Sequence, residues 1–106
     1  GSDERLWINI NDRIVVCTTD RSRITGHTLL AERATVNRFC EDSGKRMWAA
    51  TEKGIFVWKD DAPAGRLFAG CDVQDIIPLD DDRLLAAVSG RGIFTVSTRD
   101  FSSPTA

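Results

Sequence analysis

The sequence predicts an all-β protein built from antiparallel, four-stranded meander repeats, and two observations support this prediction. Short apolar runs rich in Val, Ile, Phe, Trp and Thr alternate with clusters of Gly, Asp, Asn, Ser and Pro, which is the pattern of strands and turns. The same pattern recurs along the chain at intervals of 37 to 41 residues. Repetition at such an interval indicates one structural unit copied in series.

The repeat is clearest between residues 44–60 and residues 81–100. At an offset of 37, and of 38 after the inserted Arg91, the aligned pairs are Arg46 and Arg83, Met47 and Leu84, Ala49 and Ala86, Ala50 and Ala87, Gly54 and Gly92, Ile55 and Ile93, and Phe56 and Phe94. A fainter copy, at an offset of 41, places Arg5, Leu6, Trp7, Ile14 and Val15 on Arg46, Met47, Trp48, Ile55 and Phe56. Recurring apolar positions indicate that neighbouring copies pack face to face.

Within these copies the apolar runs predict ten strands, at residues 5–10, 13–18, 27–31, 35–40, 46–51, 54–59, 66–69, 73–79, 83–88 and 92–98. Tight turns are expected at Asn11-Asp12, Ser43-Gly44, Lys53-Gly54, Asp80-Asp81 and Gly90-Arg91. Connections this short force consecutive strands to pair antiparallel.

A four-stranded meander of about 40 residues has the size of one β-propeller blade. The 106 residues are expected to form a single domain of about two and a half blades. These are a partial blade at 3–31, a complete blade at 35–69 and a partial blade at 73–98, followed by a tail at 99–106.

An open stack of blades exposes two apolar sheet faces to water. Burying one large apolar side chain stabilises a protein by about 1.5–3 kcal/mol, and this stabilisation is lost where the side chain stays exposed. A whole domain is stable by only about 5–15 kcal/mol. The chain is therefore expected to associate with itself into a closed ring, with a homodimer favoured over larger assemblies.

One stretch, "SGKRMWAATEKGIFVWKD" at residues 43–60, resembles the two-component regulator propeller repeat of hybrid histidine kinase sensor domains. The motif positions are occupied by Gly44, Met47, Trp48, Ala50, Thr51, Gly54, Ile55 and Trp58. The other copies depart from the motif at Leu85, Val88 and Arg13. The resemblance implies a propeller fold, ligand sensing rather than one chemistry, and a periplasmic or extracellular setting; nothing else in the sequence indicates a compartment.

Composition narrows the classes of partner. The chain has 14 basic and 16 acidic residues, a formal net charge of −2, which argues against binding nucleic acid. Its longest apolar runs are four or five residues, well below the roughly 20 that span a membrane, so no transmembrane segment is expected. Cys17, Cys40 and Cys71 match no metal-binding or disulfide pattern; buried thiols are expected, with a Cys17–Cys40 bridge left open.

No catalytic, metal or cofactor site is expected. The single histidine, His27, has no hydrolase or zinc motif around it. The acidic run at residues 80–82 lacks the alternating ligands of a calcium loop and aligns with a turn. Trp7 and Trp48 are interpreted as packing residues rather than sugar-stacking ones, because Leu85 takes the same position in the third copy. For Trp58 the sequence does not distinguish between these two roles.

Binding is expected where the loops of a propeller gather around its channel. The candidate ligand-binding residues in these loops are Asn11, Arg13, Arg33, Asn37, Glu52, Lys53, Asp72, Gln74 and Arg91. The leading hypothesis is a non-enzymatic module that binds a small ligand, a carbohydrate being one candidate, or a protein. One alternative is a natural fragment or engineered scaffold that only assembles into a ring; another is a propeller enzyme of lyase or lactonase type.

Overall fold

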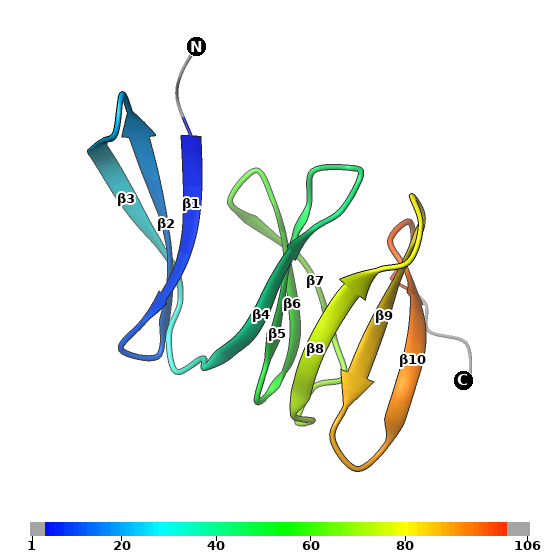
Figure 1. Cartoon of the computed structure of the whole chain (residues 1–106). Coiled ribbons are helices and arrows are strands. Elements are labelled where there is room, and N and C mark those ends of the chain that lie inside the picture. Colours follow the sequence, from blue (N-terminus) through cyan, green and yellow to red (C-terminus); the bar gives the residue numbers. More distant parts are fainter. Residues whose placement is uncertain (1–3, 102–106) are drawn as a thin grey trace. The chain divides into compact units, whose positions relative to one another are not determined.

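The computed structural model describes residues 4–101, which form ten strands and no helix (Figure 1). The strands are β1 (Glu4–Ile10), β2 (Arg13–Asp20), β3 (Arg23–Ala31), β4 (Val36–Glu41), β5 (Met47–Thr51), β6 (Gly54–Lys59), β7 (Ala62–Leu67), β8 (Val73–Pro78), β9 (Arg83–Val88) and β10 (Gly92–Ser97). All pairings are antiparallel. The predicted all-β class and the ten strands are confirmed. No element of residues 4–101 is a helix long and apolar enough to cross a membrane.

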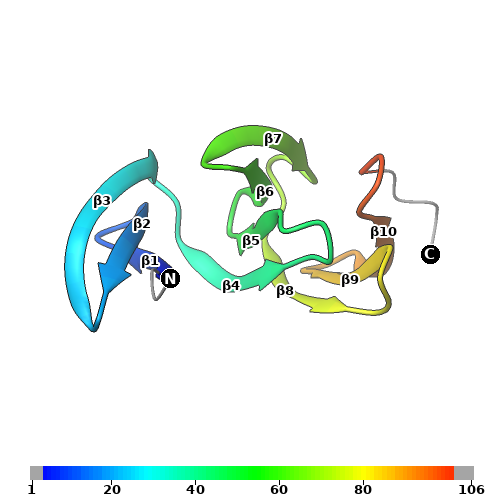
Figure 2. The ribbon, with the colours of Figure 1, turned by 90° about the horizontal axis from the view of Figure 1, so that it is seen from above.

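Three sheets follow one another along the chain, with strand orders β1-β2-β3, β4-β5-β6-β7 and β8-β9-β10. The chain divides into two compact units, one ending at Thr35 and the other beginning at Val36. The first unit holds one sheet. In the second unit β8 lies against β4 and β5, as Figure 2 shows. Residue 3 of the expected first blade and residues 102–106 of the expected tail lie outside the described residues.

Two-residue turns with positive φ connect the two strands in three of the hairpins. The central residues are Asn11 and Asp12 (φ 51° and 58°), Arg21 and Ser22 (52° and 66°), and Asp60 and Asp61 (52° and 66°). Such turns match the right-handed twist of paired strands. Only the first was predicted, because the strands after the other two were expected to begin at residues 27 and 66, which left residues 21–22 and 60–61 inside longer connections.

Two strands begin four residues earlier than the sequence predicted. β3 starts at Arg23 rather than at residue 27, and β7 starts at Ala62 rather than at residue 66. The predicted strand left residues 62–65, which include Pro63 and Gly65, in the preceding connection. In the structure β7 is an edge strand, and Pro63 sits beside a shift in its register with β6, where a missing N–H is tolerated.

The core of the second unit lies between its two sheets. One face of the β4–β7 sheet, here called the Trp48 face, carries Cys40, Trp48, Ala50, Ile55 and Val57. The face of the β8–β10 sheet packed against it, here called the Leu84 face, carries Ile76, Leu84, Ala86, Val88 and Val96. All ten side chains are buried. The interpretation of Trp48 as a packing residue is therefore confirmed, and Trp58 is buried as well.

Candidate functional sites at the sheet ends and on the sheet faces

The first unit ties its β1–β2 turn to the segment that follows β3. The Asp12 carbonyl accepts a 2.7 Å hydrogen bond from the Ala34 N–H, and the Asp12 carboxylate accepts one of 3.0 Å from the Thr35 hydroxyl. Asn9 Nδ2 donates to the carbonyls of Arg13 and Ala34. Three predicted site residues of this unit, Asn11, Arg13 and Arg33, are exposed.

The second unit repeats this arrangement at its β5–β6 turn. The Lys53 carbonyl accepts a 3.0 Å hydrogen bond from the Gly70 N–H, in the connection between β7 and β8. Among the predicted site residues, Asn37 Nδ2 donates to Asp72 Oδ1 at 3.3 Å and to the Val73 carbonyl at 2.9 Å. Arg91 Nη1 lies 3.5 Å from Cys71 Sγ.

Not all six predicted site residues of the second unit are joined by contacts. Asn37 and Asp72 are brought together, whereas Glu52 and Gln74 are exposed residues on the β5–β6 turn and on β8. These residues therefore present a polar surface of mixed charge.

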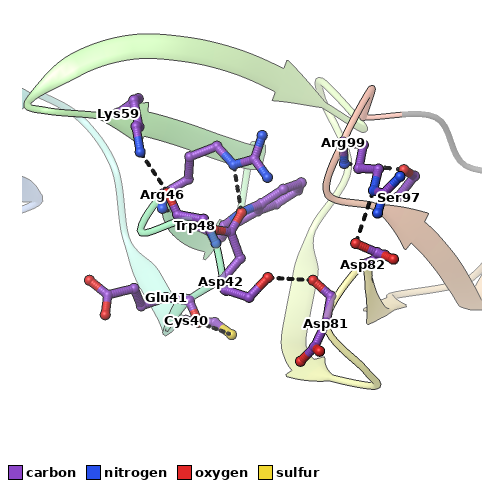
Figure 3. Close-up of polar contacts among 12 residues, drawn as sticks. Cys40, Glu41, Asp42, Arg46, Trp48, Lys59, Asp81, Asp82, Ser97 and Arg99 are labelled. Carbon is purple, nitrogen blue, oxygen red and sulfur yellow. Dashed lines mark hydrogen bonds and ion pairs between the residues drawn. The ribbon is translucent and has the colours of Figure 1, made fainter.

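A buried carboxylate that the sequence analysis did not single out lies between β4 and β5 (Figure 3). Asp42 Oδ2 accepts hydrogen bonds of 2.8 Å from both Trp48 Nε1 and Arg46 Nε. Its Oδ1 accepts from the N–H groups of Gly44 and Arg46, at 2.8 and 2.9 Å. The Phe101 ring stands edge-on to Trp48, with centroids 5.3 Å apart. The spacing of Asp, Arg and Trp in "DSGKRMW" was the signal that could have indicated this cluster.

The electrostatics of Asp42 favour its charged form. Burial raises the pKa of this carboxyl, but the hydrogen bonds from the Arg46 backbone, from Trp48 and from the Arg46 side chain outweigh burial, so that the pKa lies below its usual value. A carboxylate that already accepts four hydrogen bonds has little capacity left for a ligand. Asp42 therefore positions Trp48 rather than acting as a reactive group.

The acidic run at residues 80–82 forms part of the turn between β8 and β9, as predicted. Asp80 Oδ2 accepts hydrogen bonds of 2.6 and 2.8 Å from the guanidinium of Arg83, which lower the pKa of the carboxyl. Asp82 Oδ1 pairs with Arg99 Nε at 3.0 Å. Within residues 4–101, no three His, Cys, Asp or Glu side chains are grouped as metal ligands.

The three cysteines are free thiols. Cys40 is buried in the core, and burial, followed by the nearby charge of Asp42, raises the pKa of its thiol. Cys17 and Cys71 are partly exposed rather than buried as expected. His27 is exposed on β3, directly across from Cys17 on β2.

One face of the first sheet is apolar and open. The Leu6 face, as we call it, carries Leu6, Ile8, Ile10, Val15, Cys17 and Leu29, which share one side of the sheet by strand register. Leu6, Ile8, Ile10 and Leu29 are 39–54% exposed. On the opposite face Ile14 and Val16 are buried.

The third sheet also has an open apolar face. The Ile93 face carries Ile77, Leu85, Ala87 and Ile93, on the side of the sheet opposite the Leu84 face. Ile77 and Ile93 are 50% and 62% exposed. Together with Asp75, these four residues line a shallow hollow of about 100 Å³. Contiguous exposed apolar surface of this kind marks interaction sites in folded proteins.

The chain matches no protein-family model, no curated protein and no solved structure. The resemblance to the two-component regulator propeller repeat therefore stays an interpretation of residues 43–60.

Proposed function

We propose that the chain is a non-enzymatic module of β-propeller type that associates with copies of itself through its two open faces and so completes a closed ring. The observation that carries this proposal is the exposure of the Leu6 face and the Ile93 face. Full burial of one large apolar side chain contributes about 1.5–3 kcal/mol. Covering these faces is therefore a large driving force for association.

The arrangement of the strands supports the propeller part of the proposal. Each sheet is a meander of sequential antiparallel strands, and β8 follows β4 as the first strand of its sheet and lies against it. Propellers repeat such sheets radially, typically with four to eight blades. The three sheets of one chain fall short of that number, so a ring requires additional sheets.

Mass in solution tests the proposal. Light scattering over a concentration series should give at least twice the 11.7 kDa chain mass. The double variant Ile8→Glu, Ile93→Glu should be a folded monomer by the same measurement and by circular dichroism. A wild-type chain that is folded and monomeric at every concentration would overturn the proposal.

A second candidate function is binding at the loops that connect the strands at the sheet ends. There the assembled module would bind a small ligand, such as a carbohydrate, or a protein. Supporting observations are the hydrogen bonds that tie each turn to the next connection, Asp12 to Ala34 and Lys53 to Gly70, since ordered loops on a rigid scaffold suit binding. Amide chemical-shift changes on titration with a glycan library test this. Because Trp48 and Trp58 are buried, their fluorescence is a poor reporter.

A further inference from the structure

We infer that a second copy of this chain covers both open faces, with the Leu6 face of one copy seated on the Ile93 face of the other. This inference rests on the proposed self-association and specifies which faces meet. It joins unlike faces head to tail, and two such contacts between two copies leave neither face open.

The repeat identifies which faces belong together. Positions on the Trp48 face correspond to positions on the Ile93 face: Cys40 to Ile77, Trp48 to Leu85, Ala50 to Ala87 and Ile55 to Ile93. Positions on the Leu84 face correspond to positions on the Leu6 face: Leu84 to Leu6, Ala86 to Ile8 and Val88 to Ile10. The strand registers agree, because Ala87 pairs with Ile93 as Ala50 pairs with Ile55.

The second unit contains the template for this contact. There the Trp48 face of one sheet packs on the Leu84 face of the next and forms a fully buried core. Of the two open faces, the Ile93 face corresponds to the Trp48 face, and the Leu6 face corresponds to the Leu84 face. Seating the Leu6 face on the Ile93 face therefore repeats an interface that the chain already makes with itself.

Side-chain volumes compensate across the inferred contact. The Ile93 face has Leu85 where the template has the larger Trp48, which leaves room on that side. The Leu6 face has Ile8 and Ile10 where the template has smaller residues, Ala86 and Val88. Protein interiors are close-packed, so large residues must meet small ones. The hollow beside Leu85 and Ala87 can therefore receive the larger isoleucines.

Two copies also supply enough sheets to close a propeller. Two chains supply six sheets, twice the three of one chain, within the usual four to eight blades of a propeller. Head-to-tail contacts either close into a ring or continue into a filament. A closed pair therefore predicts a mass that stops at two chains.

Two single variants distinguish this head-to-tail contact from a contact between like faces. Ile8→Glu blocks only the Leu6 face and Ile93→Glu only the Ile93 face, and both side chains are exposed, so each variant should fold. Ala64→Glu, an exposed site on β7, adds the same charge elsewhere and should assemble like the wild type.

In the head-to-tail mode each single variant alone is monomeric, because every contact needs one face of each kind. An equimolar mixture should form a 1:1 pair through the two intact faces. Having one contact in place of two, this pair should dissociate at a concentration at least tenfold higher than the wild-type dimer.

The outcomes are distinct. A single variant that still self-associates indicates contact between like faces and overturns the inference alone. A mixture that forms no pair, or a wild-type mass that grows without limit with concentration, also overturns it. A monomeric wild type overturns the proposed function and the inference with it.

Thiol footprinting gives an independent readout. Cys17 lies on the Leu6 face and is partly exposed, so the inferred contact covers it. Its alkylation should be at least tenfold slower in the assembled wild type than in Ile8→Glu, with Cys71 as the internal reference. Equal rates for Cys17 in the two proteins would overturn the inference.

Discussion

Oδ2 of Asp42 accepts a 2.8 Å hydrogen bond from Nε1 of Trp48, the largest fully buried side chain of residues 4–101. The contact fixes the indole within the interface between the two sheets of the second unit. The Trp48 face is also the template for the inferred contact between copies, and Asp42 stabilises this template interface.

Removing the Asp42 carboxylate should destabilise the protein strongly. Asp42→Ala leaves a buried indole N–H and part of the Arg46 guanidinium without an acceptor, and we expect a loss of about 2–4 kcal/mol in the free energy of unfolding. Urea denaturation followed by Trp fluorescence measures it. Asp80→Ala is the matched control, since its ion pair with Arg83 is exposed, and it should change stability little. Similar losses in both variants would contradict a special role for Asp42.

The Asp42 carboxylate should also make the free energy of unfolding depend on pH. The pKa of Asp42 in the folded protein is below the unfolded value of about 3.9, so its contribution is complete above that pH and is lost as pH falls through the folded pKa. Urea midpoints measured from pH 6 down to pH 2.5 should drop below about pH 4. The drop should be smaller in Asp42→Asn, which has no charge to lose. Parallel curves for the two proteins would show that Asp42 contributes nothing to the acid sensitivity.

Gly54 and Gly92 occupy equivalent repeat positions and should respond differently to alanine. Both have positive φ, 122° and 103°, so each substitution introduces backbone strain of about 1–2 kcal/mol. A methyl at Gly54 would also stand 2.8 Å from the Leu67 carbonyl oxygen, whereas at Gly92 no described atom lies within 4 Å. We expect Gly54→Ala to cost about 1–3 kcal/mol more than Gly92→Ala in thermal or urea unfolding. Equal costs would show that strain alone decides.

Gly65 leaves space for the ring of Phe101. A methyl at Gly65 would stand 2.9 Å from Cδ2 and Cε2 of Phe101, so Gly65→Ala must displace the ring from its edge contact with Trp48. An aromatic pair of this kind contributes about 0.5–1.5 kcal/mol. The two changes should therefore be coupled, with Gly65→Ala costing less in a Phe101→Ala background. A double-mutant cycle in urea measures the coupling, and additive effects would contradict the contact.

The sequence by itself determined the strands. Alternating apolar residues and turn dipeptides act over a few residues, so the positions of all ten strands could be predicted, to within a few residues, without knowledge of their neighbours. The prediction failed where a distant contact decides the outcome. Pro63 reads locally as a turn, and only the pairing of β7 at the edge of its sheet makes it part of a strand.

Only the tertiary structure decided which apolar faces are covered. Ile55 and Ile93 are equivalent in the repeat, yet Ile55 is fully buried and Ile93 is 62% exposed. The Asp42–Trp48 hydrogen bond and the seat of Phe101 at Gly65 likewise arise from packing between strands. The physical reason is that burial depends on what lies across a sheet face, and a residue's local sequence says nothing about that neighbour.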